Sequence, residues 1–251
     1  MNRRFENQVV LVIGGNSGIG LACVKAFAAE GARVALTGRN RQSLDAAAQA
    51  IEPNGLAIQA DITDLGQHDA VTRAVADRFG RIDVLFVSAG GGGVGPIEAI
   101  TPESWDQAFA VNLKGAYFMI QKALPMMRAG SSIVLTSSLA ARKTLPHLSV
   151  YSAAKAGVTS LARTLGAELV ERGIRVNVVT PGPIDTPLLD RTPGISPAQA
   201  QQIRDQVAAN SPMKRWGTAD EAARIVLFLA SHEASFITGT DTVIDGGASA
   251  V

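Results

Sequence analysis

The sequence predicts an α/β fold in which a doubly wound parallel sheet is covered by helices on both faces. Short apolar runs alternate along the chain with longer segments of helical pattern, and this alternation is typical of repeated strand–helix units. The runs are hydrophobic at nearly every position, as in strands that are buried on both faces. With 251 residues the chain is long enough to bury one large core, so we expect a single domain over residues 1–251.

The expected strands are the apolar runs Val9 to Ile13, Arg33 to Thr37, Leu56 to Ala60, Val84 to Val87, Ile133 to Thr136, Arg175 to Val179 and Thr242 to Ile244. The segments between them suit helices, notably Gly20 to Glu30, Leu65 to Phe79, Trp105 to Met127 and Ser152 to Arg172. Right-handed crossovers between parallel strands would place these helices on both faces of the sheet.

Composition and charge exclude several classes of protein. The chain is 47% hydrophobic and 18% charged, with a formal net charge of +1, so neither disorder nor a general attraction to nucleic acid or membranes is indicated. Its single cysteine, Cys23, cannot form an internal disulfide, and no apolar signal core follows Met1. No apolar stretch approaches the roughly 20 residues of a transmembrane helix. We therefore expect a cytoplasmic protein without membrane or nucleic-acid partners, and the histidine spacing predicts no metal.

A glycine-rich turn follows the first expected strand and leads into the first expected helix. Glycines permit a tight turn and a close approach of the backbone, while the amides at the start of a helix stabilise a pyrophosphate. The strand–turn–helix context therefore predicts a dinucleotide site, and the expected cofactor contacts in the turn are Gly14, Asn16, Ser17, Gly18, Ile19 and Gly20.

The end of the second strand bears on the choice of cofactor. Arg39 stands in Leu36-Thr37-Gly38-Arg39-Asn40, where a carboxylate for the adenosine ribose 2′-hydroxyl is expected. A guanidinium pairs with a 2′-phosphate through a charge-assisted bidentate contact, so Arg39 favours NADPH/NADP+ over NADH/NAD+, and Arg41 is placed to assist. Stacking of Arg39 on adenine and a solvated surface charge are the alternatives.

Two further strand ends supply candidate cofactor contacts. Asp61, with Ile62 beside it, ends the third strand and is placed to bind the adenine amino group, although an Asp before a helix is equally typical of an N-cap. Ser88, Ala89 and Gly90 follow the fourth strand and are expected to pass close to the adenosine ribose. The glycines at 91–93 have no adjoining helix start, so we interpret them as a permissive backbone segment.

Tyr151 and Lys155 are the candidate catalytic pair, because a spacing of four residues places both side chains on one face of a helix. A tyrosine has an ordinary pKa of about 10, and a nearby ammonium group is expected to lower that pKa and make the phenol a usable general acid or base. Ser138 follows an apolar strand, so its hydroxyl should emerge where ligands bind in open α/β sheets. Strand alternation should turn the neighbouring Ser137 to the other face. The combination predicts a hydride-transfer enzyme.

Residues 183–212 break the strand–helix rhythm. One short helical stretch, 197–209, is surrounded by Pro183, Pro187, Pro193, Gly194, Pro197 and Pro212. A long loop inside a compact domain is usually functional or disordered, and this one directly follows the end of a strand. Our hypothesis is that it encloses the substrate, and the alternative is a surface connection without catalytic consequence.

An ordered set of motifs runs through the chain: the Gly14/Gly18/Gly20 turn, Ser88-Ala89-Gly90, Asn112 in Val111-Asn112-Leu113-Lys114-Gly115, Ser138, Tyr151 with Lys155, Pro181-Gly182, Ile237-Thr238-Gly239 and Asp245-Gly246-Gly247. With this set the chain resembles the short-chain dehydrogenase/reductase family over nearly its whole length. The resemblance implies a Rossmann-type seven-stranded sheet in the order 3-2-1-4-5-6-7. It also implies a homotetramer with helix–helix and C-terminal-strand interfaces. Ile13 and Val87-Ser88 depart from the family pattern, and they bear on cofactor affinity more than on reaction type.

The resemblance further implies roles for individual residues. In the catalytic tetrad, Ser138 would hydrogen-bond the substrate oxygen and Tyr151 would transfer the proton. Lys155 would lower the tyrosine pKa and bind the nicotinamide ribose, while Asn112 would hold a water that links Lys155 to solvent. Asn112, Tyr151 and Lys155 thereby also count as cofactor contacts. The remaining expected cofactor contacts are Pro181, Gly182, Ile184 and Thr186, with Thr186 and the Ile184 backbone anchoring the carboxamide.

The expected activity is the NADP(H)-dependent interconversion of a ketone or aldehyde and an alcohol, with Tyr151 as general acid or base. NAD-dependent alcohol oxidation within the same family is the nearest alternative, and a dinucleotide-binding regulator without turnover is an alternative of another class. Binding alone does not need a tuned phenol, so the tetrad favours an enzyme. The sequence leaves steroid, sugar, acyl-thioester and xenobiotic carbonyls open as substrates. We interpret His147, before Tyr151, as a solvated side chain.

Overall fold

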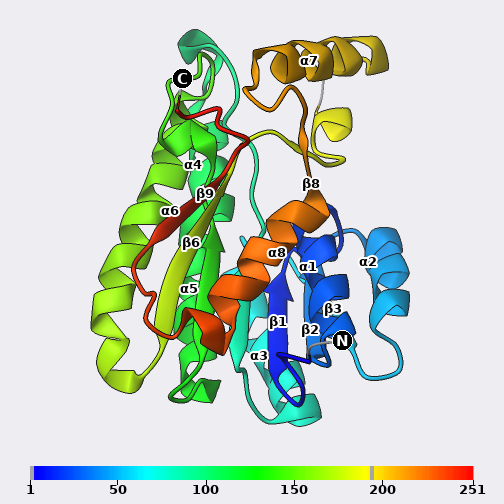
Figure 1. Cartoon of the computed structure of the whole chain (residues 1–251), viewed down its shortest axis with the longest axis vertical. Coiled ribbons are helices and arrows are strands. Elements are labelled where there is room, and N and C mark those ends of the chain that lie inside the picture. The colour runs from blue at the N-terminus through cyan, green and yellow to red at the C-terminus, as the bar shows by residue number, and fades with distance from the viewer. Residues whose placement is uncertain (1–2, 193–194, 251) are drawn as a thin grey trace.

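The apolar runs predicted as strands pair into one parallel sheet (Figure 1) in a computed structural model, which describes residues 3–192 and 195–250. The strands of this sheet are β1 (Val9–Ile13), β2 (Arg33–Gly38), β3 (Leu56–Gln59), β4 (Val84–Val87), β5 (Ser132–Thr136), β6 (Arg175–Pro181) and β9 (Asp241–Ile244). Their order is β3-β2-β1-β4-β5-β6-β9, and every neighbouring pair is parallel. The predicted fold class and strand order are confirmed, with β9 as the seventh strand.

The α-helices of the described residues are α1 (Gly18–Ala29), α2 (Arg41–Ala48), α3 (Leu65–Phe79), α4 (Pro102–Phe109), α5 (Gly115–Ala123), α6 (Ser149–Glu168), α7 (Pro197–Asn210) and α8 (Ala219–Ala230). Apart from α7, they lie on the two faces of this sheet (Figure 1). Side chains of Asn40, Asp64, Thr101, Ser196 and Thr218 accept hydrogen bonds from backbone amides and so define where five of these helices begin. Within residues 3–192 and 195–250, no helix is both long enough and apolar enough to traverse a bilayer.

Alternate residues of each strand face two different cores, because successive side chains of a strand point to opposite faces. In β1, Val9, Leu11 and Ile13 join the core that includes residues of α3, α5 and α6. Val10 and Val12 join the other core, against residues of α1 and α8. All five residues of β1 are buried, and this double coverage explains the uninterrupted apolar run that predicted the strand.

The segment predicted as one helix from Trp105 to Met127 is helical without a break as far as Met126, but it is not α-helical throughout. Helix α4 ends at Phe109, a π-helical turn occupies Ala110–Lys114, and α5 follows. Apolar periodicity does not distinguish a π turn from an α turn, so this interruption has no clear signature in the sequence. Such turns are frequent at functional sites, and this one carries Asn112.

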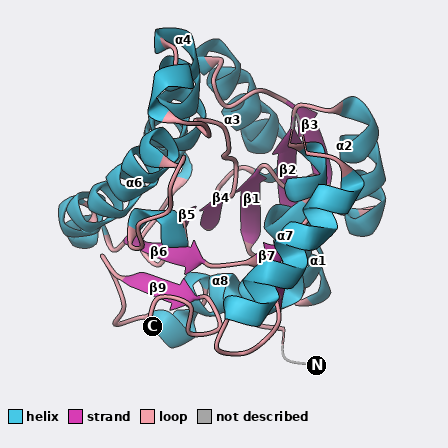
Figure 2. Ribbon diagram, turned by 90° about the horizontal axis from the view of Figure 1, so that it is seen from above, coloured by secondary structure: helices cyan, strands magenta, loops and turns pink. Residues whose placement is uncertain are grey.

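The segment predicted as an insertion is closed at its base by a small second sheet. Strands β7 (Ile184–Asp185) and β8 (Gly217–Thr218) pair in parallel, so the chain leaves and rejoins the main body at one place. Helix α7 corresponds to the helix predicted at 197–209 and lies above the carboxyl ends of the strands (Figures 1 and 2). Strands of two residues are too short to be predicted from alternation, and Pro193 and Gly194 lie outside the described residues.

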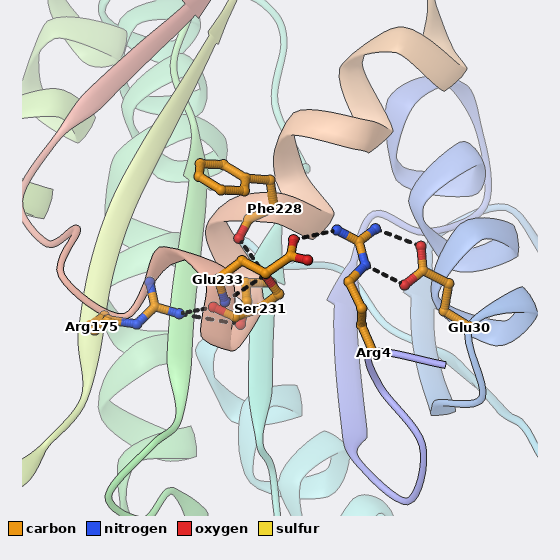
Figure 3. A network of polar contacts seen from close by, with 7 residues as sticks. Arg4, Glu30, Arg175, Phe228, Ser231 and Glu233 are labelled. Atoms are coloured by element: carbon orange, nitrogen blue, oxygen red, sulfur yellow. Dashed lines mark hydrogen bonds and ion pairs between the residues drawn. The ribbon is translucent and has the colours of Figure 1, made fainter. Parts of the chain in front are cut away.

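Charged side chains stabilise the amino-terminal edge of the sheet (Figure 3). Arg4 donates to Glu30 at the end of α1, with an Nε–Oε2 distance of 2.6 Å, and to Glu233 at 3.0 Å. Arg175 of β6 donates to the carbonyl oxygens of Leu229 and Ser231 at 2.8 and 2.9 Å, where the exposed carbonyls at the end of α8 favour a cation. These contacts therefore stabilise the fold at the amino-terminal ends of the strands, and the candidate active site lies at the carboxyl ends.

Candidate active site at the carboxyl ends of the strands

The glycine turn between β1 and α1 is too tightly packed for side chains. A Cβ at Gly20 would lie 2.1 Å from the Gly14 carbonyl oxygen, and a Cβ at Gly14 would lie 2.9 Å from the Ala89 nitrogen. Gly18 has a φ of 52°, in the left-handed region that favours glycine. Ser17 precedes α1 without a side-chain cap, so the first amides of α1 remain available to an anion. The cradle therefore fits the pyrophosphate of a dinucleotide.

The end of β4 runs directly beside this turn. The amides of Ser88 and Ala89 both donate to the Ile13 carbonyl oxygen, at 2.9 and 3.1 Å, and so hold the segment that leads to Gly90. Ile13, where the family has threonine, is 3% exposed and packs in the core. Its side chain thus contributes to the core, while its backbone still ties the turn to the end of β4.

Asn16 connects the turn to the start of α2. Its Nδ2 donates to Ser43 Oγ at 2.8 Å, and Ser43 in turn donates to the oxygens of Asn40. Gly38 allows this approach, because a Cβ there would lie 2.4 Å from Asn16 Cγ. The turn and the start of α2 therefore form one continuous wall beside Arg39.

Arg39 lies exposed at the end of β2, with 65% of its side chain accessible. Its Nη1 is 3.6 Å from Asp61 Oδ2, a longer separation than the 2.9 Å between Arg41 and Asp45. Burial would raise the pKa of Asp61, but hydrogen bonds from Thr63 and the charge of Arg39 together hold that pKa below its ordinary value. Arg39 and a charged Asp61 thus face one another across this corner.

The backbone at Asp61 is held by two residues of α3 that the sequence did not single out for the site. The Asp61 amide donates to Gln67 Oε1 at 2.9 Å, and Nε2 of the buried His68 lies 2.9 Å from the Ile62 carbonyl oxygen. A carbonyl only accepts, so Nε2 must carry the proton. The helix N-cap is Asp64, and the alternative reading of Asp61 as that cap is wrong.

Ser138, Tyr151 and Lys155 come together where β5 ends and α6 begins. Tyr151 forms a side-chain hydrogen bond with Ser138. Lys155 Nζ donates to the Thr136 carbonyl oxygen at 2.9 Å and lies 5.8 Å from the centroid of the Tyr151 ring. Ser137, in contrast, is buried and donates to the Lys155 carbonyl oxygen at 3.0 Å. Ser137 therefore bonds to the backbone of α6, while Ser138 lies beside the phenol of Tyr151.

Asn112 reaches the same place from the π-helical turn. Its side chain donates to the carbonyl oxygens of Gly91 and Ala108, both at 2.8 Å, and accepts from the Gly91 amide at 3.0 Å. A Cβ at Gly90 would lie 2.7 Å from Asn112 Oδ1 and 2.8 Å from Lys155 Nζ. The close approach of Gly90 therefore brings the end of β4, the π turn and α6 together at one point.

Burial dominates the electrostatics of this cluster. It raises the pKa of Tyr151, against the opposing effect of the Ser138 hydrogen bond, and it lowers the pKa of Lys155 to about 8. The net shift of the Tyr151 pKa is therefore upward, where the sequence predicted a lowered pKa, because desolvation of the phenol outweighs the stabilisation that a nearby ammonium gives to the phenolate, and Lys155 donates its hydrogen bond to Thr136. Tyr151 is therefore held as a neutral phenol, ready to donate a proton.

The remaining residues predicted from the resemblance lie around β6 and β7. Pro181 ends β6 in register with Ile244, and the Gly182 amide donates to the Ile244 carbonyl oxygen at 2.9 Å. Ile184 is buried in β7. The Thr186 side chain returns to the glycine turn, 3.3 Å from where a Cβ of Gly18 would lie. The start of the 183–212 segment thus borders the phosphate cradle.

His147 contributes to this region through its backbone. Its carbonyl oxygen accepts from the Gly95 amide at 2.8 Å, it has a φ of 67°, and its side chain is exposed. In the part of the chain that the structure describes, no three His, Cys, Asp or Glu side chains are grouped so as to hold a metal ion.

Comparison with known proteins agrees with this geometry. A family model described as enoyl-(acyl carrier protein) reductase matches residues 13–249. Oxidoreductase asL5 of Sarocladium schorii is 38% identical over 247 residues, covering 98% of this chain and 97% of the relative. Levodione reductase of Leifsonia aquatica is 36% identical over 256 residues, covering 98% and 96%.

A solved structure also has the same fold as this chain. The short-chain dehydrogenase/reductase from Brucella melitensis, titled a glucose/ribitol dehydrogenase, superposes with a TM-score of 0.92 at 33% identity and 99% coverage of both chains. Other relatives are named galactitol 2-dehydrogenase, of Agrobacterium fabrum, and sorbitol dehydrogenase, of Cereibacter sphaeroides, each 35% identical over 254 residues. The chain belongs to the short-chain dehydrogenase/reductase family, an oxidoreductase family that uses NAD(P) cofactors and acts on CH–OH and C=O groups.

Proposed function

We propose that this protein is an NADP(H)-dependent oxidoreductase that interconverts a ketone or aldehyde and an alcohol, with Tyr151 as the general acid or base. The observation that carries the proposal is the convergence of Tyr151, Ser138 and Lys155 beside a glycine cradle that fits a pyrophosphate. A regulator that only binds a dinucleotide has no need for a buried lysine next to a desolvated phenol.

When bound, the nicotinamide supplies the hydride that the carbonyl carbon accepts. Ser138 donates a hydrogen bond to the carbonyl oxygen, and the neutral phenol of Tyr151 donates its proton as negative charge develops there. The positive charge of Lys155 would stabilise the resulting phenolate, and its ammonium would also bind the nicotinamide ribose. Asn112, which bonds to Gly91 and Ala108, would hold a water that connects Lys155 to solvent. In the direction of alcohol oxidation the same groups act in reverse.

Arg39 supports NADP(H) as the cofactor. Its guanidinium is exposed, only distantly paired with Asp61, and stands where a 2′-hydroxyl acceptor would otherwise be expected. Arg41 is engaged with Asp45 and is the weaker candidate. Asp61 and Ile62, held by Gln67 and His68, complete the adenine side of the site.

Replacing Arg39 by alanine is expected to raise the KM for NADPH by about 10- to 100-fold, the value of one or two charge-assisted hydrogen bonds, and to leave the KM for NADH nearly unchanged. Steady-state kinetics with both cofactors measures this split. The matched control is Arg41→Ala, where the expected change is less than threefold because that side chain is paired locally. A wild-type preference for NADH, or equal losses with both cofactors in Arg39→Ala, would contradict the assignment.

We further propose that residues 1–251 form one catalytic domain in which the 183–212 segment encloses the substrate. The β7–β8 pairing at its base and the contact of Thr186 with Gly18 support this role. We also propose a homotetramer. An apolar groove of about 550 Å³ along α5 and α6, lined in part by Leu113, Tyr117 and Leu161, and the fully exposed Phe236 support contacts between copies. Sedimentation equilibrium measures the assembly.

The experiment that tests the reaction is NADPH oxidation across ketones and aldehydes of several chemical classes, repeated with NADH. The expected result is turnover of at least one carbonyl class with NADPH preferred. Turnover only with NAD+ and alcohols would favour the alternative of an NAD-dependent alcohol dehydrogenase. A complete lack of turnover together with tight NADPH binding would favour a regulator.

A further inference from the structure

We propose that the substrate of this site is an uncharged, mainly hydrocarbon ketone or aldehyde, and not a sugar, a polyol-derived ketose or a phosphorylated carbonyl compound. The inference rests on the proposed carbonyl-reducing function and specifies its substrate class. It follows from where this chain exposes its large apolar side chains and from how it pairs its charges.

Exposed apolar side chains gather at one edge of the molecule. Nine large apolar side chains are exposed among the described residues. Four of them lie on connections that follow the carboxyl ends of β4, β5 and β7, namely Val94, Ile97, Leu145 and Leu188, and a fifth, Met213, lies between α7 and β8. Val94 is 59% exposed and Leu188 is 61% exposed. Single exposed apolar residues are ordinary, but a concentration on loops around one site indicates a ligand surface.

Backbone contacts hold two of these connections beside the catalytic tyrosine. A Cβ at Gly93 would lie 3.2 Å from the Tyr151 nitrogen, and the Gly95 amide donates to the His147 carbonyl oxygen at 2.8 Å. Val94 is therefore fixed between the start of the catalytic helix and the loop that carries Leu145. The backbone contacts therefore hold the segments that carry Val94 and Leu145 next to each other and near the start of the helix that carries Tyr151.

Leu188 lies on the connection that follows β7. Two residues before it, Thr186 packs on Gly18 of the phosphate cradle, so this stretch runs over the place where the cofactor would lie. Seen from above, the loops after β4 and β5 lie toward α4 and α6, while α7 lies toward α1 (Figure 2). A substrate that enters between these elements would meet apolar side chains on both sides.

Three arginines on or near these connections are paired with carboxylates. Arg142 pairs with Asp241 at 2.9 Å, Arg204 with Asp190 at 2.8 Å, and Arg215 with Glu221 at 2.7 Å. A site that selects a polyol or a phosphate needs fixed polar partners for each hydroxyl or charge. The glycine-rich segment 90–95 has no polar side chain to offer. These connections thus offer apolar contacts to a substrate and few hydrogen-bond partners to hydroxyl groups.

The test is NADPH oxidation by the full-length enzyme with two probes, 4-methylcyclohexanone and D-xylulose. The expected result is a kcat/KM at least about 100-fold higher for the ring ketone than for D-xylulose. Each apolar contact that only the ring ketone makes changes the ratio of the two kcat/KM values by about tenfold or more, and several such contacts are expected. Equal efficiency with both probes, or a preference for xylulose, overturns the inference while leaving the proposed function standing. Absence of turnover with every carbonyl in the wider screen overturns both.

Two variants test the lining directly. Val94→Asn and Leu188→Asn are expected to raise the KM for 4-methylcyclohexanone by about fivefold or more, with kcat and the KM for NADPH within about twofold of wild type. Both side chains are exposed, so folding should be preserved. The matched control is Val170→Asn, which changes a residue that is 55% exposed and lies outside these connections. An unchanged KM for the ring ketone in both lining variants overturns the inference.

Discussion

Tyr151→Phe is expected to lower kcat by about 100- to 10,000-fold in both reaction directions, the usual contribution of a positioned general acid or base. The substitution removes the hydroxyl that bonds to Ser138 and keeps the ring beside Lys155. Nothing in the glycine cradle or around Arg39 changes. The affinity for NADPH should therefore stay within about twofold of wild type, and fluorescence titration of the bound nucleotide measures it.

The control for this variant is Tyr117→Phe, at a tyrosine that is 41% exposed on α5. Its kcat should match that of wild type. If Tyr151→Phe kept more than about a tenth of the wild-type kcat, another group would have to supply the proton, and the assignment of the general acid would be wrong. Loss of NADPH binding in step with turnover would instead indicate a structural role for the hydroxyl.

Lys155→Met is expected to abolish most turnover and at the same time to stabilise the protein at neutral pH. Burial lowers the pKa of Lys155 from 10.5 to about 8, so the fold disfavours the charged form. A shift of that size corresponds to about 3 kcal/mol. Loss of the hydrogen bond to the Thr136 carbonyl subtracts about 1 kcal/mol, which leaves an expected gain of about 2 kcal/mol in the free energy of unfolding at pH 7.

The pH dependence of this gain has a definite sign. Between pH 8 and 10.5 the unfolded chain binds a proton at Lys155 that the folded chain has released, so the stability of the wild type rises with pH through this window. The advantage of Lys155→Met should consequently shrink to near zero by about pH 9.5. Urea unfolding at pH 7 and 9.5 measures it.

The exposed Lys25 of α1 provides the control, because Lys25→Met should shift the free energy of unfolding by less than about 0.5 kcal/mol at either pH. A Lys155→Met protein that is less stable than wild type at pH 7 would show that the buried ammonium contributes to the fold. Burial of the Lys155 ammonium would then not lower the free energy of unfolding, contrary to our expectation.

Local patterns were sufficient for the framework of the fold. The apolar run Val9 to Ile13 identified β1 because a strand covered on both faces is hydrophobic at every position. The glycines of the following turn identified the phosphate cradle, since only glycine fits where a Cβ would collide with backbone. The spacing of Tyr151 and Lys155 predicted that both side chains share one face of a helix, and α6 places them together, because α-helical geometry is set locally.

Contacts between residues distant in the sequence decided the rest. The π turn at Asn112, the hold of His68 on Ile62, and the β7–β8 pairing depend on partners that no local pattern specifies.

The pKa of Tyr151 also depends on contacts that the local sequence does not specify. Spacing alone predicted that Lys155 would lower the tyrosine pKa, but a pKa depends on how deeply the surrounding protein removes a group from water. The sequence by itself determined which elements form and which residues are candidates for the chemistry, because periodicity, turns and helix spacing are local. Only the tertiary structure decided the burial of Tyr151 and Lys155 and the direction in which their pKa values shift, because desolvation arises when distant segments pack together.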